Sequence, residues 1–491
     1  MTDHRDITSL VRANTPLLVF DTAEERRAVE LFRKVVAEVW RPLFQWTIAD
    51  GLTRLDMDLD NSDKTSEPGA ALRVIRETNE RGIYLLLDFQ PFIEDPVNQR
   101  LMRDIIQRVK GGAHTVVMIG PEQTLPDHLE RAATRLQMKL PDDAELERIV
   151  RDEAFKWSRH NDGRRVKVSR KALTMLVKNL RGLSSRDARK LARNAIYNDG
   201  AIMECDIPGA MQAKFELLNA SGVLHYEYEP VGLDDIAGMD RLKAWLKLRQ
   251  PIFDGAKPPP GLTPPRGILL LGVQGCGKSM AAKAVAAGFG VPLLRLDFGS
   301  IYNKYHGESE RNLRQSLETA SIMSPCILWM DEIEKGLAIT SSDGGVSKRI
   351  LGTLLTWMAE HKTSVFMVAT ANDVSALPPE LLRKGRFDEI FFVDLPNLQE
   401  RQAITAIHLR NRELNPDDFD LAAIAEGTDG WSGAEIEQAI VQALYAAYAD
   451  SRPMRQQDLV AAIMASVPLS VTMREHVEQL RQWASGRTVP A

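Results

Sequence analysis

The sequence has few cysteines, no long apolar run and no basic excess, and each absence excludes a class of protein. Three cysteines occur in 491 residues, and none belongs to a CxxC pair, which argues against a disulfide framework. The longest apolar stretches, GIYLLLDF and GILLLGV, fall well short of the roughly 20 residues that span a bilayer. The formal net charge of -5 is unlike that of a nucleic-acid-binding protein. We therefore expect a cytoplasmic protein with no membrane or nucleic-acid partner.

The chain is long enough for more than one domain, because single hydrophobic cores stop growing near ~250–300 residues. An acidic, turn-rich stretch, YEYEPVGLDDIAGMD, and a proline-rich stretch, AKPPPGLTPPRG, mark a junction near the middle of the chain. We predict four parts, an α/β module, a helical lid-like subdomain, an α/β core and a helical lid, over residues 1–145, 146–225, 226–397 and 398–491.

Strands and helices alternate in the second half, which is typical of a mainly parallel sheet covered by helices on both faces. The apolar runs that predict its strands are Gly267–Leu271, Pro292–Asp297, Cys326–Asp331, Val365–Thr370 and Ile390–Val393. From Glu400 onward the sequence predicts helices only, so we expect the lid to follow the core.

The first half repeats this layout in the same order, which indicates a degenerate internal duplication. TPLLVFDTAEERRAVELF parallels RGILLLGVQGCGKSMAAKAVAAGF as strand, turn and helix. Further along, Asp88 aligns with Asp331, which leaves Phe89 opposite Glu332. Two more pairs match in order, Glu145 with Glu400 and Ser184 with Ser432. An unrelated α/β domain is the alternative.

The stretch GVQGCGKS fits the phosphate-loop pattern GxxxxGK[ST] and stands where that pattern requires, between a strand and a helix. Its glycines allow backbone N–H groups to surround phosphate oxygens, and the helix N-terminus adds partial positive charge. We expect Lys278 to neutralise the β- and γ-phosphates of ATP and Ser279 to hold Mg²⁺. The other residues expected to contact the nucleotide here are Gly272, Gly275, Cys276, Gly277 and Met280.

A buried strand, CILWM, ends in two carboxylates, and acids at the carboxyl edge of an open α/β sheet lie where ligands bind. We expect Asp331 to share Mg²⁺ with Ser279. Glu332 is expected to orient and deprotonate the attacking water. Asn372, at the end of the next strand, is placed to bind the γ-phosphate or that water.

Two arginines in LLRKGRFDE, Arg383 and Arg386, lie three residues apart beside a glycine. Guanidinium groups on a turn suit phosphate recognition, but these lie too far along the fold to reach the nucleotide of their own chain. Donation to the site of a neighbouring subunit explains them and implies a ring. A solvated surface pair is the alternative.

Together these motifs resemble those of the AAA-type ATPases of the AAA+ superfamily, over residues 233 to about 447. In LDDIAGMDRLK the resemblance implies that Asp235 and Ala237 pack on the adenine, although the family usually has glycine where Ala237 stands. It implies a P-loop NTPase core with a helical lid. The lid residues that it implies close over the base are His408, Gly433 and Ala434.

The resemblance also implies a pore loop that contacts the substrate. SIYNKYHGESERNLRQ is similar to the first pore loop of the family, and Tyr305 falls where many members place an aromatic residue on the central channel of the ring. Lys304 and His306 flank it. A ring of aromatics can hold an extended polypeptide by apolar and stacking contacts whatever its sequence. An ordinary tyrosine beside a helix is the alternative.

The full-length plan resembles a narrower group, the AAA proteins of cyanobacteria and algal plastid genomes with relatives in other bacteria. We expect an ATPase with ATP and Mg²⁺ as cofactors, assembled as a homo-oligomer, a hexamer, that remodels or threads a protein substrate. A nucleotide-switched assembly scaffold or regulatory ATPase without threading is the second hypothesis, and a nucleic-acid remodeller, disfavoured by the charge, is the third. The first module lacks a phosphate loop, so we expect it to bind no nucleotide.

Overall fold

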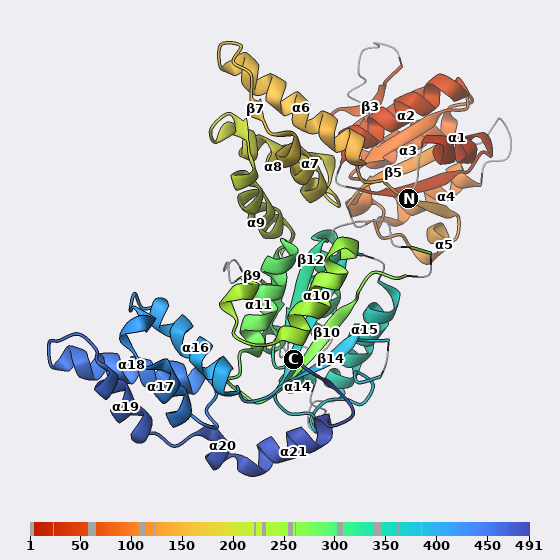
Figure 1. The fold of residues 1–491 in the computed structure, drawn as a ribbon. Helices are drawn as coiled ribbons and strands as arrows, with labels where there is room; N and C mark the ends of the chain where they lie inside the picture. Colours follow the sequence, from red (N-terminus) through yellow and green to blue (C-terminus); the bar gives the residue numbers. More distant parts are fainter. Residues whose placement is uncertain are drawn as a thin grey trace. The chain divides into compact units, whose positions relative to one another are not determined.

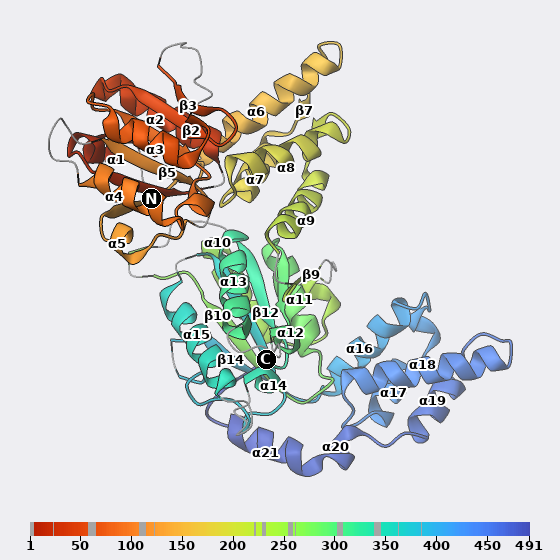
Figure 2. The same cartoon turned by 180° about the vertical axis from the view of Figure 1, so that it is seen from behind.

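The computed structural model places the chain in two compact units, Met1–Glu204 and Cys205–Ala491 (Figure 1 and Figure 2). The residues that the structure describes are 4–22, 24–56, 65–107, 114–121, 123–219, 222–227, 232–253, 259–260, 262–301, 308–337, 345–361, 363–383 and 385–491. Among these residues, none of the helices is both long enough and apolar enough to cross a lipid bilayer.

The first unit begins with an α/β module whose sheet, over the described residues, has the strand order β3-β2-β4-β5-β1-β6. Its strands are β1 (Leu17–Asp21), β2 (Leu43–Thr47), β3 (Gly51–Arg54), β4 (Ile83–Leu87), β5 (Thr115–Gly120) and β6 (Ala133–Gln137). Neighbouring strands are parallel except at the edge, where β3 pairs antiparallel with β2.

Helices cover both faces of this sheet. The helices α1 (His4–Arg12) and α2 (Glu25–Val39) pack on one face, and α3 (Pro68–Glu77) and α4 (Pro96–Ile106) pack on the other. Two short helical turns, η2 (Gln90–Phe92) and α5 (Asp127–Glu130), follow strands. Because both faces are buried, the central strands β1, β4 and β5 appear in the sequence as nearly continuous apolar runs without alternation.

A helical second domain completes the first unit. Its helices are α6 (Asp143–His160), α7 (Arg170–Leu180) and α8 (Ser185–Tyr197), and a short parallel pair joins β7 (Lys167–Val168) to β8 (Ala201–Ile202). Ser184 caps α8 by accepting a hydrogen bond from the Asp187 N–H at 3.1 Å. The expected helical subdomain is therefore present after the first α/β module.

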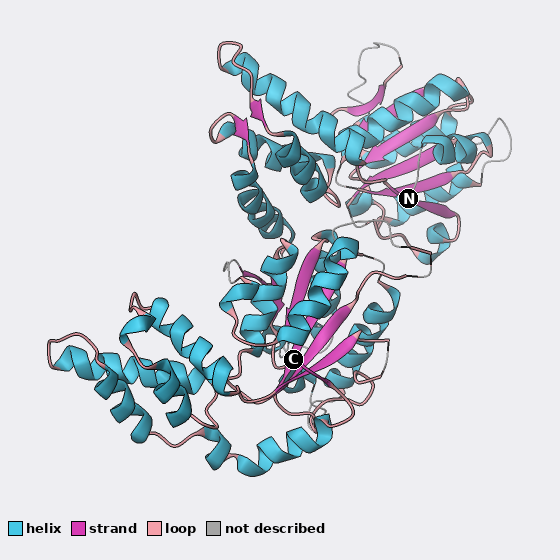
Figure 3. Cartoon of the chain, viewed as in Figure 1, coloured by secondary structure: helices cyan, strands magenta, loops and turns pink. Residues whose placement is uncertain are grey.

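The second unit contains a sheet with the order β15-β14-β10-β13-β12-β11-β9 over its described residues. The central strands are β10 (Gly267–Gly272), β11 (Leu293–Leu296), β12 (Cys326–Met330), β13 (Val365–Ala371) and β14 (Glu389–Val393). These five strands are mutually parallel, and each lies where its apolar run predicts it. The strands of both units lie between layers of helices (Figure 3).

Helices again form two layers around this sheet. The helices α10 (Asp240–Phe253) and α11 (Lys278–Phe289) cover one face. The helices that cover the other face are α12 (Phe298–Ile301), α13 (Glu308–Ile322), α14 (Ile333–Leu337) and α15 (Val346–Glu360). Three connecting elements come before β10 in the chain. They are the turn η3 (Glu204–Asp206), α9 (Ile207–Leu218) and the turn η4 (Leu233–Asp235). Phe215 of α9 packs into the core of this second unit.

A helical lid with its own hydrophobic core follows the sheet. It consists of α16 (Leu398–Arg410), η5 (Pro416–Asp418), α17 (Leu421–Gly427), α18 (Gly433–Ala449) and α19 (Gln456–Met464). The chain then runs through α20 (Leu469–Thr472) and α21 (Arg474–Ala484) to β15 (Val489–Pro490), which pairs with β14. The prediction that no strand follows the core is therefore wrong. The edge strand β9 (Leu224–Glu227), antiparallel to β11, was also not predicted.

The two sheets share one strand topology. The order β6-β1-β5-β4-β2-β3 in the first unit matches β14-β10-β13-β12-β11-β9 in the second, and in both the last strand is the antiparallel edge. The helix caps match as well. Asp142 and Asn397 each accept a hydrogen bond from the N–H of the expected glutamate, Glu145 or Glu400. The first module is thus an AAA-like α/β module, as the sequence predicts.

The structure corrects the alignment of the two modules by one residue. Asp88 has φ of 48° and Glu332 has φ of 47°, so both turn the chain in the left-handed conformation directly after the strand. Phe89 and Ile333, which follow them, both enter the core on the face opposite α2 or α11. Asp88 therefore corresponds to Glu332, not to Asp331, and Phe89 does not replace the glutamate.

Candidate functional site

The second unit has a cavity of about 560 Å³ at the carboxyl edge of its parallel sheet. The loop between β10 and α11 forms its floor, and the ends of β12 and β13 form one side. The lid helices α16 and α18 and the chain around Pro490 and Ala491 complete it. This is the edge at which open α/β sheets bind their ligands.

The loop before α11 needs its glycines. Gly275 and Gly277 have φ of 78° and 85°, which residues with a side chain rarely adopt. A Cβ at Gly275 would lie 3.0 Å from Ser432 Oγ and 3.1 Å from the Ala434 Cβ. The Gly275 carbonyl also accepts a hydrogen bond from the Ala434 N–H at 3.0 Å. The start of the lid helix α18 thus docks directly on this loop.

Lys278 is buried at the first position of α11, with a relative exposure of 6%. Its Nζ donates hydrogen bonds to the carbonyl oxygens of Gly272, at 2.9 Å, and Val273, at 2.7 Å. Burial lowers the pKa of Lys278 to about 8, and the nearby acidic groups only partly oppose this effect. An anion in the cavity would therefore hold the ammonium form.

Ser279 and Asp331 lie together as expected. Asp331 Oδ1 accepts hydrogen bonds from Ser279 Oγ at 3.2 Å and from Thr370 Oγ1 at 2.6 Å. A hydroxyl and a carboxylate are hard oxygen donors of the kind that Mg²⁺ prefers, and Mg²⁺ commonly takes only one or two protein ligands beside phosphates. The donors fit that ion. No larger group of His, Cys, Asp or Glu side chains suited to a metal occurs in the described part of the chain.

Glu332 and Asn372 form the second pair at this edge. The Glu332 Oε1 accepts a hydrogen bond from Asn372 Nδ2 at 2.9 Å, and its backbone N–H donates to Thr370 Oγ1 at 2.9 Å. The other carboxylate oxygen, Oε2, is bound by Lys335. The carboxylate is thus oriented by an amide donor beside the cavity, and Glu332, Asn372 and Thr370 all line it.

Two residues of this cluster escaped the sequence analysis. Thr370 bridges Asp331 and Glu332 by the bonds just described. Glu334 is 5% exposed, and its Oε1 accepts a hydrogen bond from the Asn372 backbone N–H at 2.9 Å. Burial raises the pKa of Glu334, while the Asn372 N–H opposes the shift. The pattern DEIE marks Glu334 only as a third acid on a short helix, which is an ordinary surface pattern.

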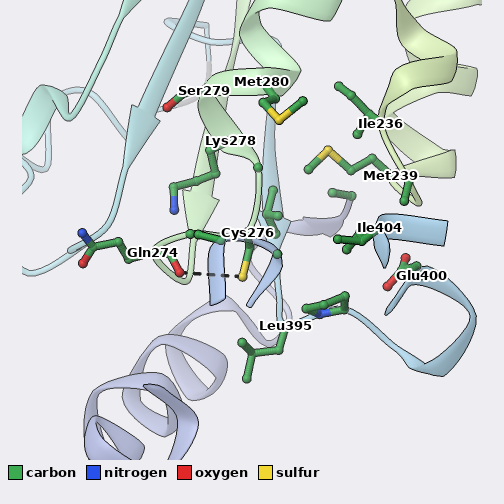
Figure 4. A pocket seen from close by; sticks show the side chains of 18 of the residues that line it. Ile236, Met239, Gln274, Cys276, Lys278, Ser279, Met280, Leu395, Glu400 and Ile404 are labelled. Carbon is green, nitrogen blue, oxygen red and sulfur yellow. Dashed lines mark hydrogen bonds between the residues drawn. The ribbon is translucent and has the colours of Figure 1, made fainter. Parts of the chain in front are cut away.

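Apolar side chains line much of the cavity away from Asp331 and Glu332. Figure 4 shows Ile236, Met239, Met280 and Ile404 around the same space. The predicted residues that also line the cavity are Asp235, Ala237, Gly275, Cys276, Gly277, His408, Gly433 and Ala434. Cys276 Sγ lies 3.9 Å from the Gln274 carbonyl oxygen, and burial raises the pKa of its thiol to about 12. Cys276 is therefore a neutral wall residue.

His408 reaches this wall from α16. Burial lowers the pKa of its imidazole, and Arg412 lowers it further, while Glu437 opposes both. The imidazole is therefore neutral near pH 7, and its 3.8 Å approach to Glu437 is not an ion pair. A neutral ring can serve as donor or acceptor to a base.

Arg383 and Arg386 lie outside the lining of the cavity. Arg383 is exposed, while Arg386 Nη1 donates to the Leu355 carbonyl at 2.6 Å. The predicted pore-loop residues Lys304, Tyr305 and His306 lie outside the described residues.

The first unit has a cavity of about 770 Å³ at the equivalent place, between the end of β1 and the start of α8. Asp21 binds Arg135 at 2.9 Å. Glu24, directly before α2, binds Arg27 at 3.0 Å. Two of the acids that follow β1, Asp21 and Glu24, are therefore paired with arginines. What the cavity lacks is a lysine at the start of α2, where Glu25 stands.

Family models match most of the chain in the same order as its domains. The model for the SpoVK-like AAA ATPase N-terminal domain matches residues 3–138, and that for its second domain matches residues 144–221. The model for the ATPase family associated with various cellular activities (AAA) matches residues 268–395, and the AAA+ lid domain matches 418–461. An uncharacterized AAA domain-containing protein, ycf46 of Guillardia theta, is 34% identical over 494 residues, 98% of this chain and 94% of that protein.

The chain belongs to the AAA family of ATPases. The ycf46 protein of Pyropia yezoensis is likewise 34% identical, over 487 residues that cover 98% of this chain and 97% of its own. The proteasome-activating nucleotidase of Aeropyrum pernix is 30% identical over 316 residues, 62% of this chain and 75% of that protein. The order of the matched domains, a SpoVK-like N-terminal domain, its second domain, an AAA domain and a lid, agrees with the fold class expected from the sequence.

Proposed function

We propose that this AAA ATPase binds ATP with Mg²⁺ in the cavity of the second unit and hydrolyses it, within a ring that remodels or threads a protein. One observation supports ATP hydrolysis most directly. A buried lysine, a hydroxyl–carboxylate pair and an amide-oriented glutamate all lie at one edge of the sheet, beside an apolar pocket for a base.

The roles follow from the contacts. Lys278 would exchange its two loop carbonyls for phosphate oxygens, which are stronger acceptors for an ammonium group. Ser279 and Asp331 would hold Mg²⁺, which neutralises charge on the phosphates when bound. Glu332, fixed by Asn372, would accept a proton from the attacking water, and Asn372 Nδ2 would keep that carboxylate in position.

The ring and its protein substrate are supported by sequence and by relatives. Arg383 is exposed and outside its own nucleotide cavity, as an arginine donated to a neighbouring subunit should be. We propose a homo-hexamer, with Lys304, Tyr305 and His306 contacting an extended polypeptide. A relative named as a proteasome-activating nucleotidase supports a protein substrate for this chain.

The test of hydrolysis is Glu332→Gln, with Glu360→Gln at the exposed end of α15 as the matched control. Loss of a general base costs about 10²–10⁴ in rate, so phosphate release should fall by at least about 10² while ATP still binds. The control should behave as wild type. Unchanged phosphate release in Glu332→Gln would show that this glutamate is not the base.

A further inference from the structure

The segment after the lid returns to the core and forms part of the nucleotide cavity. Its strand β15 pairs in parallel with β14, placing Val489 beside Phe391 and Pro490 beside Phe392. The Ala491 N–H donates to the Phe392 carbonyl at 3.0 Å. Pro490 and Ala491 line the cavity together with β14. In Figure 4 this segment, in pale violet, enters the view beside Leu395.

A second anchor holds the same segment through α21. Leu480 is 2% exposed and lies in the hydrophobic core on the face of the sheet that α12 to α15 cover. Trp483 packs against the same core. Arg481 binds both carboxylate oxygens of Asp394, with Nε at 3.0 and 2.9 Å and Nη2 at 2.9 Å from Oδ1. Asp394 directly follows β14 and lines the cavity. The Arg481 anchor thus binds a residue that lines the cavity, Asp394.

The geometry makes this attachment dependent on both anchors. A two-residue edge strand contributes few ladder hydrogen bonds, and an isolated strand of that length has no stability of its own. The helix α21 contributes the apolar contact with the core. The guanidinium group of Arg481 fixes the orientation of the segment, because it binds both carboxylate oxygens of Asp394. The matched family domains end at residue 461, so none of them assigns a role to this segment.

We propose that residues 477–491, from the buried Val477 of α21 to Ala491, form a C-terminal strap that is a working part of the nucleotide site. The docked strap completes the cavity wall along β14, and Arg481 is a positioning residue that acts through Asp394. Because the docked strap forms part of the cavity wall, its docking should tighten nucleotide binding. The coupling is reciprocal, so a bound nucleotide should also stabilise the docked strap. The proposal rests on the proposed function only in that the ligand is an adenine nucleotide.

The test uses the full-length protein and a fluorescent ADP with Mg²⁺. Arg481→Ala should raise the dissociation rate and the Kd by about fivefold or more, the lower end of coupling between linked sites. Arg474→Ala, an exposed arginine on the same helix, is the matched control and should match wild type. A chain ending at Ser485 removes β15 and should show a larger increase than Arg481→Ala.

Hydrogen exchange supplies a readout that does not depend on the variants folding. ADP should slow exchange at the Ala491 amide of the wild-type protein, because that amide lies in the strap ladder. Wild-type nucleotide kinetics in both Arg481→Ala and the shortened chain, with no change in exchange on ADP binding, would overturn the strap. Absence of ADP binding to the wild-type protein would instead overturn the proposed function.

Discussion

Lys278 is the residue on which the phosphate site depends most, and its burial makes nucleotide binding sensitive to pH. Its folded pKa is about 8, below the ordinary 10.5, so the free site is only partly charged above pH 8. Bound phosphates raise that pKa again, and binding must then take up protons. We expect uptake of about half a proton per nucleotide at pH 8.

Calorimetry in two buffers of different ionisation enthalpy measures this uptake. The ATP affinity should also fall as the pH rises from 8 toward 10, since the neutral amine must first be protonated. At pH 7, where the lysine is already charged, uptake through this group should be close to zero. Equal values at pH 7 and pH 8 would mean that Lys278 is not desolvated in the free protein.

Glu334 is the second residue with a measurable role. Its Oε1 holds the Asn372 N–H, and its Oε2 is buried with no hydrogen-bond partner among the described residues. Glu334→Ala should cost about 1–3 kcal/mol in unfolding free energy, the cost of an unsatisfied buried group, and should slow hydrolysis by displacing Asn372. Glu334→Gln keeps the acceptor and removes the charge, so it should retain both stability and rate in chemical denaturation and phosphate-release assays.

Single residues show where sequence reasoning succeeds and where it stops. The pattern GxxxxGK[ST] predicts a strand, a tight turn and a helix that begins at Lys278, and the structure has β10 and α11 in these places. The one-residue error at Asp88 arose because β4 is buried on both faces, so its apolar run carries no alternation to set the register. Glu334 could not be found, since its burial depends on tertiary contacts.

At the scale of elements, the contact between the phosphate loop and the start of α18 joins the lid to the core. Gly275→Ala would strain a residue with φ of 78° and press its Cβ against Ser432 and Ala434. Gly290→Ala is the matched control, because Gly290 also has positive φ, at 63°, but no neighbour within 4 Å.

Both glycine variants should cost about 1–2 kcal/mol of backbone strain, measured by chemical denaturation. Only Gly275→Ala should also weaken ATP binding, by more than about tenfold, because it separates the lid from the loop. Equal ATP affinities in the two variants would show that the lid contact does not contribute to the site.

The elements themselves were largely predictable. The five central strands of the second unit follow directly from apolar runs, and the caps at Ser184 and Ser432 follow from helix-start chemistry. The edge strands β9 and β15 were not predictable, because they are short and partly exposed. The four residues LHYE of β9 alternate, but so short a stretch does not distinguish a strand from a loop. The pair of Asp21 with Arg135 in the first unit joins residues 114 positions apart in the sequence, so no local pattern predicts it.

At the scale of the whole molecule, the proposed ring predicts that active sites are shared. Arg383→Ala should leave ATP binding nearly intact and lower hydrolysis by roughly 10³–10⁵, the contribution of an arginine finger in related chemistry. Mixing it with Lys278→Ala should restore part of the activity, because each variant supplies the group that the other lacks. Mixtures that remain as inactive as the separate variants would place Arg383 outside any shared site.

The central claim is that one of the two AAA-like modules works as the nucleotide site and the other does not. The first module has acids paired to Arg27 and Arg135 and begins α2 with Glu25, so an anion meets no lysine at the helix start. The most direct measurement is the ATP-binding stoichiometry of Glu332→Gln, with and without Lys278→Ala, by calorimetry. The account predicts no more than one ATP per chain for Glu332→Gln and almost none for the double variant. Two ATP per chain, or a tight site that survives Lys278→Ala, would contradict it.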